Sequence, residues 1–93
     1  MNPKNVVSPK SLMKLGEVLY ENEDFAIASL LWGKKLRIGI RWNGKENELG
    51  YPNSRGRATW FVLPKAVALA YAETIGDAKM KHTIELSTED SFV

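Results

Sequence analysis

A chain of 93 residues without a cysteine suffices for one small domain, 1–93, and excludes disulfides, thiolate nucleophiles and cysteine-ligated metal sites. The net charge of +2 is unevenly distributed: residues 34–65 carry eight basic and two acidic side chains, and the remainder carries five basic and nine acidic ones. Such a basic middle can attract an anionic partner. No apolar run approaches the ~20 residues of a membrane span, and residues 1–10 lack the apolar region of a signal peptide. We therefore expect a soluble cytoplasmic protein without a membrane partner.

Three strands in the first half of the chain predict an antiparallel meander. The polar residues 1–10 are expected to form an N-terminal arm. Residues 14–20 run into a polar turn, which favours a strand, although the leucine spacing over 11–20 also fits a helix and leaves that choice open. The apolar run 25–32 is bounded by turn residues and suits a buried strand.

The clearest predicted strand covers 36–42, where apolar and polar residues alternate with the period of a strand buried on one face. Its apolar face, expected to lie on the core, consists of Leu36, Ile38, Ile40 and Trp42. The opposite, polar face is expected to be exposed, and Gly39 on it leaves room for a close approach or a bend.

A polar loop at 43–57 follows, and its Gly and Pro residues exclude a regular element. Loops of this length are usually functional or disordered. Its apolar residues, such as Leu49 and Tyr51, predict that it is ordered against the domain. A strand rich in aromatic and apolar residues is expected over 58–63.

The last third of the chain predicts a helix over 64–75, with Pro64 in its first turn and Gly76 as its stop. The helix face towards the core is expected to hold Val67, Tyr71, Thr74 and Ile75. Residues 81–86 are expected to form an edge strand, and 87–93 a frayed tail. The predicted fold class is α+β: a small antiparallel sheet, a meander plus one further strand, packed against one C-terminal α-helix.

No set of residues in the chain indicates catalysis. The only histidine, His82, lies near the acidic tail, and no phosphate-binding glycine motif follows a strand. We therefore expect a protein that is not an enzyme and that uses neither a cofactor nor a metal.

Arginines beside aromatic residues are the strongest functional signal, because guanidinium groups bind phosphates while rings stack on bases. Two alternatives stay open: Trp60 can be the core partner of Trp42, and the arginines can hold the loop through backbone carbonyls. The residues predicted to bind a partner are Arg41, Asn43, Tyr51, Ser54, Arg55, Arg57 and Trp60. The partner is expected to be a single-stranded nucleic acid or a protein, which includes a second copy of the chain in a homodimer. The low overall charge argues against nucleic acid.

A resemblance to a group of known proteins is carried by the segment RWNG, a polar insert after it, and the run GYPNSRGRATWFVLP before a helix. This pattern resembles small uncharacterised bacterial proteins encoded on mobile DNA, such as integron gene cassettes and plasmids. The resemblance covers about 24–69 and is most specific over 50–64. It implies a bacterial origin and a compact domain, and no activity or catalytic residue can be carried over from it.

Overall fold

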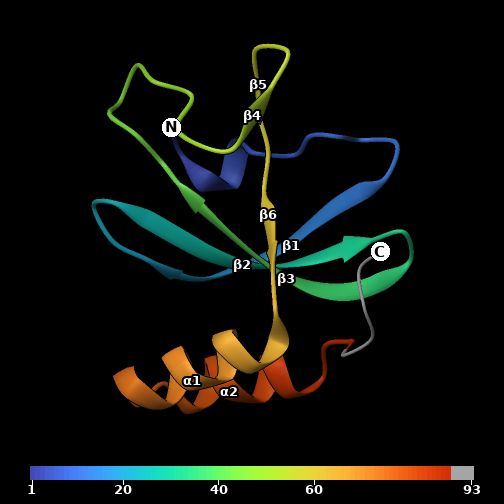
Figure 1. Ribbon diagram of the computed structural model, residues 1–93, viewed down its shortest axis with the longest axis vertical. Helices are drawn as coiled ribbons and strands as arrows, with labels where there is room; N and C mark the ends of the chain where they lie inside the picture. The colour runs from blue at the N-terminus through green and yellow to red at the C-terminus, as the bar shows by residue number, and fades with distance from the viewer. Residues whose placement is uncertain (89–93) are drawn as a thin grey trace.

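Residues 1–88 are described by a computed structural model, in which a four-stranded antiparallel sheet carries two helices on one face (Figure 1). The strand order is β1-β2-β3-β6. These strands are β1 (Met13–Glu21), β2 (Phe25–Trp32), β3 (Lys35–Trp42) and β6 (Phe61–Leu63). The α+β prediction is confirmed, and so is the meander with one further strand.

Local turn chemistry connects the three strands of the meander. The side-chain oxygen of Asn22 accepts hydrogen bonds from the backbone N–H groups of Asp24 and Phe25, which closes the turn between β1 and β2. Gly33 and Lys34 both have positive φ angles, 57° and 70°, as a two-residue hairpin between β2 and β3 requires. The two turns therefore lie at opposite ends of β2, the acidic one before it and the basic one after it.

The helical layer consists of α1 (Lys65–Ile75) and α2 (Ala78–Glu85), which lie below the sheet in Figure 1. Gly76, with a φ of 69°, ends α1 as predicted, and the Asp77 carboxylate caps α2 by accepting from the Met80 N–H at 3.0 Å. The core under this layer contains Ile27, Ile38, Ala68, Ala72, Met80 and Ile84.

One prediction about the helices is wrong, and another is wrong in part. The edge strand expected over 81–86 is part of α2, because Met80 and Ile84 stand four residues apart and bury one helical face. The core face of α1 is formed by Ala68 and Ala72, and Tyr71 packs against the same core as predicted. The other predicted core residues, Val67, Thr74 and Ile75, are exposed. Small alanines let α1 approach its neighbours closely, so its bulkier side chains lie on the flank.

The second face of the sheet is also covered, which the alternation in β3 did not indicate. A short 3₁₀ helix, η1 (Pro3–Asn5), and the segment after it pack there, so the predicted N-terminal arm belongs to the core. Trp60 is 3% exposed, lies over Gly39, and donates from Nε1 to the Val6 carbonyl at 2.8 Å. This core contains Val6, Met13, Ala26, Ala28, Leu30, Ala58 and Trp60. The polar face of β3, expected to be exposed, is buried as a result.

The remaining elements complete the connections. The predicted loop holds a small hairpin, β4 (Asn53–Ser54) and β5 (Arg57–Ala58), above the sheet, and the strand expected over 58–63 is interrupted between β5 and β6. Of the predicted frayed tail, Ser87 is buried and the Thr88 N–H donates to the Leu36 carbonyl, whereas 89–93 lie outside the described residues. Within residues 1–88, no helix has the length and apolar character needed to cross a membrane.

Candidate functional site

Arg41, near the end of β3, joins three segments of the chain from inside the protein. Its side chain is 1% exposed, and its guanidinium donates hydrogen bonds to four backbone carbonyls. Nη1 donates to the carbonyls of Pro52 and Thr59, and Nη2 donates to those of Trp42 and Leu49. Burial lowers the pKa of Arg41, but a guanidinium stays cationic at neutral pH. We call this set of contacts the Arg41 clamp.

Gly50 is the residue that lets the clamp close. Its φ is +70°, and a β-carbon at this position would stand 2.0 Å from the Trp42 carbonyl oxygen and 2.6 Å from Arg41 Nη2. The next residue, Tyr51, forms a two-way backbone bridge with Trp42, with N–H to O distances of 2.7 and 2.8 Å. Loop 43–57 is therefore ordered against β3, as its composition predicted.

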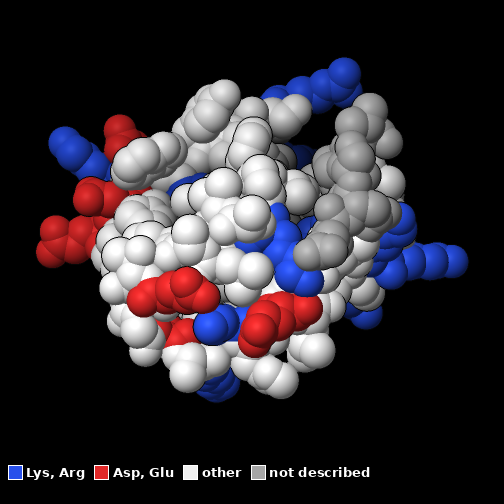
Figure 2. Space-filling view, turned by 60° about the horizontal axis from the view of Figure 1, so that its bottom comes forward, with Lys and Arg blue, Asp and Glu red and all other residues white. Residues whose placement is uncertain are grey.

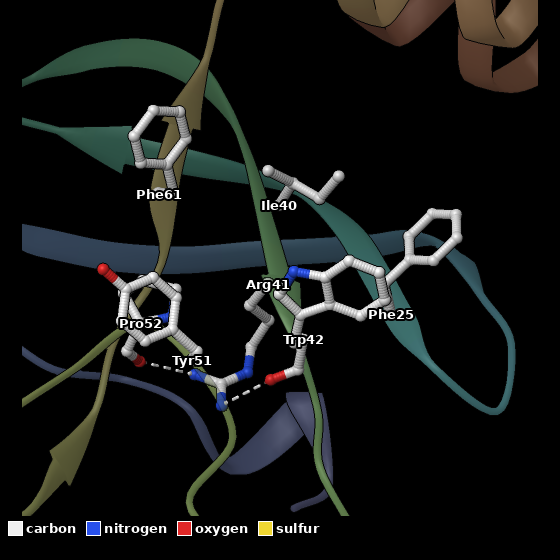
Figure 3. Close-up of a pocket in the computed structure, with 7 residues that line it drawn as sticks. All are labelled: Phe25, Ile40, Arg41, Trp42, Tyr51, Pro52 and Phe61. Atoms are coloured by element: carbon white, nitrogen blue, oxygen red, sulfur yellow. Dashed lines mark hydrogen bonds between the residues drawn. The ribbon is translucent and has the colours of Figure 1, made fainter.

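Beside the clamp, on the face of the sheet that carries the helices, large apolar side chains line an open pocket of about 320 Å³. Three of them are mostly exposed: Trp42 by 59%, Tyr51 by 67% and Phe61 by 57%. Figure 3 shows Trp42 between Phe61 and Tyr51 on one side and Phe25 on the other. We call this pocket the aromatic groove, and its lining consists of Phe25, Ile40, Arg41, Trp42, Tyr51, Pro52 and Phe61.

Strand register brings these side chains together. Phe25 lies opposite Trp42, Phe61 lies opposite Ile40, and Tyr51 bridges Trp42. Residues directly opposite each other in antiparallel strands project on the same face of a sheet. The Phe25 ring also contacts Tyr71 of α1 edge to face, with centroids 5.9 Å apart. The groove is thus an uncovered continuation of the core beneath the helices.

Charged groups around the groove are mainly acidic. Trp42 also lines a second, shallow hollow of about 250 Å³ that contains Glu23, Asp24, Lys45 and Glu48. Figure 2, seen from the helical side, shows a group of acidic side chains at the left edge and further acidic ones near the lower centre, with basic side chains between and around them.

A pair of tyrosines next to the groove has shifted acidities. A hydrogen bond from Tyr71, and a second from Asn22, lower the pKa of Tyr20, and the same bond to Tyr20 raises the pKa of Tyr71. Their rings meet edge to face at 5.4 Å. Within residues 1–88, no group of three or more histidine or acidic side chains could hold a metal ion.

The structure separates the residues that the sequence predicted as one binding surface. Four of them, Tyr51, Ser54, Arg55 and Arg57, are exposed. Arg55 lies in the turn between β4 and β5, and Arg57 is the first residue of β5. Arg41, Asn43 and Trp60 are buried instead. The three arginines therefore do not share an open surface. Arg41 fits the alternative in which an arginine holds the loop through hydrogen bonds to backbone carbonyls.

Trp42 and Trp60 do not form the core pair that the sequence suggested. Trp42, predicted to be buried, is exposed, and Trp60 is buried on the opposite face of the sheet. Sequence reasoning also missed Phe25 and Phe61 as lining residues of an open groove. The face that they share follows from the register of the strands, and no sequence signal indicated how far the helices extend over that face.

No protein-family model, no curated protein and no solved structure significantly matches this chain.

Proposed function

We propose that this chain is a non-enzymatic binding module whose aromatic groove takes an apolar segment of a partner protein. The observation that supports this proposal is that Trp42, Tyr51 and Phe61, each more than half exposed, line one groove. Burying apolar surface contributes about 25 cal/mol of favourable free energy per Å² of buried area. Clustered exposed aromatic residues are typical of the centres of protein interfaces.

The groove exists before any partner arrives, which favours binding. Trp42 and Phe61 project from paired strands, and Tyr51 is fixed by its bridge to Trp42 and by the Arg41 clamp behind it. A binding surface that is already ordered loses little conformational entropy when it is covered. The lack of cysteine suits such a module in the reducing cytoplasm.

Single-stranded nucleic acid is the second candidate partner, and the exposed arginines of the β4–β5 hairpin favour it. Arg55 and Arg57 lie a few residues after the exposed ring of Tyr51, so two phosphates and one base could be bound together. The guanidinium of Arg41 is occupied by carbonyls, which leaves two phosphate contacts instead of three. The carboxylates beside Trp42 would repel a third phosphate.

A display selection of random peptides tests the protein proposal. We expect the wild-type chain to enrich peptides with large apolar residues, and the double variant Tyr51→Ala/Phe61→Ala to lose them. The variant keeps the Arg41 clamp and should retain a cooperative thermal melt. Peptides that bind both chains equally would show that the groove is not the binding site.

A titration with a labelled oligothymidine at several salt concentrations tests the second candidate. Two phosphate contacts predict a slope of log K against log salt of about −1.4. Binding with that slope, abolished by Arg55→Ala/Arg57→Ala and unaffected by Phe61→Ala, would replace the protein partner with a nucleic acid.

A further inference from the structure

We infer that the segment taken by the aromatic groove is cationic, with an arginine or lysine next to its apolar anchor. The inference builds on the proposed function, because it specifies the chemistry of the partner at the same site. It rests on the two spaces that Trp42 lines.

Trp42 lines both an apolar space and an acidic one. The first is the aromatic groove, and the second is the hollow that contains Glu23, Asp24 and Glu48 together with Lys45. The side chain is 59% exposed, so a ligand can reach both spaces at once. An apolar group in the groove thereby brings the next residue of a peptide over or beside the indole.

The carboxylates of the hollow belong to segments that the fold holds in place. Asp24 lies in the turn closed by Asn22, and its carbonyl accepts from the Asn43 N–H at 2.9 Å. A Glu48 carboxylate oxygen accepts from the Lys45 N–H at 2.7 Å. Within residues 1–88, the three carboxylates form no ion pair with a lysine or arginine, so their charge is available to a ligand.

A cation is the group that this combination recognises. A guanidinium or ammonium near the indole face is attracted by the ring electrons, with tryptophan the best of the aromatic residues for this contact. The three neighbouring carboxylates add to the same attraction. A phosphate placed there would meet repulsion, so the hollow selects against an anionic partner.

The same charges disfavour a second copy as the occupant. In a two-fold dimer, the same patch of both subunits meets itself. A two-fold axis through the groove would bring two copies of the hollow towards each other, each with the carboxylates of Glu23, Asp24 and Glu48 in excess over the one lysine, Lys45. The basic turn at Lys34 and Lys35 lies at the opposite end of the sheet, so it cannot neutralise them in such a dimer.

Three capped tetrapeptides with one apolar core test the inference: Arg-Leu-Phe-Arg, Gln-Leu-Phe-Gln and Glu-Leu-Phe-Glu. Their binding is followed at low salt by the indole N–H resonance of Trp42. We expect the arginine peptide to bind about tenfold more tightly than the glutamine peptide, from exposed ion pairs and a cation–π contact. The glutamate peptide should bind most weakly, and high salt should remove the differences.

Charge variants assign the preference to the hollow. Glu23→Gln/Asp24→Asn/Glu48→Gln should abolish the preference for arginine and leave the affinity of the glutamine peptide unchanged. The matched control, Glu17→Gln/Glu73→Gln/Glu85→Gln, changes the net charge equally at other exposed positions and should keep the preference.

The outcomes distinguish a failure of the inferred cationic preference from a failure of the proposed function. Equal affinities for the three peptides, or tightest binding of the glutamate peptide, would overturn the inference and leave the proposed function standing. A preference for arginine that survives the triple variant of the hollow would also overturn it. Absence of binding by all three peptides, up to their solubility limit, would overturn the proposed function itself.

Discussion

Replacing Arg41 with methionine should lower the free energy of unfolding by about 3–5 kcal/mol. Four hydrogen bonds from a charged donor would amount to about 6–12 kcal/mol if each contributed 1.5–3 kcal/mol independently. The buried guanidinium must lose its hydration, which offsets part of this sum. Methionine keeps an apolar stem of similar length, so the variant removes the donors without opening a large cavity. The carbonyls of Leu49 and Thr59 lose their hydrogen bonds, whereas those of Trp42 and Pro52 still accept from the N–H groups of Tyr51 and Thr59.

Urea denaturation monitored by tryptophan fluorescence measures this loss. The expected loss is a large share of the total stability, which for a 93-residue chain is about 5–14 kcal/mol. The matched control is Arg57→Met, at an exposed position of β5, which should change stability by no more than about 0.5 kcal/mol. Amide exchange at Tyr51 should become faster in Arg41→Met, because its bridge to Trp42 depends on the clamp. A loss below about 1 kcal/mol, or a loss equal to that of Arg57→Met, would refute the clamp as a stabilising element.

Three other measurements test the fold and the surroundings of the groove. Ile38→Ala should cost about 2–5 kcal/mol in a denaturant melt, since the side chain is 2% exposed in the core under the helices; a cost below about 0.5 kcal/mol would contradict that position. Gly50→Ala should destabilise clearly more than Gly56→Ala, because both have positive φ but only Gly50 lies against the β3 backbone; equal melting temperatures would show that the close approach is absent. Tyr71→Phe should raise the pKa of Tyr20 towards its ordinary value by removing the hydrogen bond that lowers it; an unchanged ultraviolet titration of Tyr20 would exclude that bond.

Most of the secondary structure could be predicted from the sequence, because it depends on neighbours in the chain. The alternation in β3 reflects the two-residue period of a strand, and it identified which residues share a face. Gly76 was recognised as the end of α1, since the left-handed backbone conformation favours glycine. The run 25–32 was assigned to a buried strand from its continuous apolar character, and β2 is central in the sheet with both faces covered.

The tertiary structure alone decided which faces are covered. The alternation in β3 suggested one buried and one exposed face, but segments distant in sequence cover the polar face, among them Val6, whose carbonyl accepts from Trp60 54 residues later. That covering makes Arg41 a clamp inside the protein instead of a phosphate ligand on its surface. Conversely, Trp42 has the position of a core residue, yet its side chain is more than half exposed. Local periodicity specifies the direction of a side chain. Its burial depends on contacts between remote segments, and these contacts determine both the Arg41 clamp and the aromatic groove.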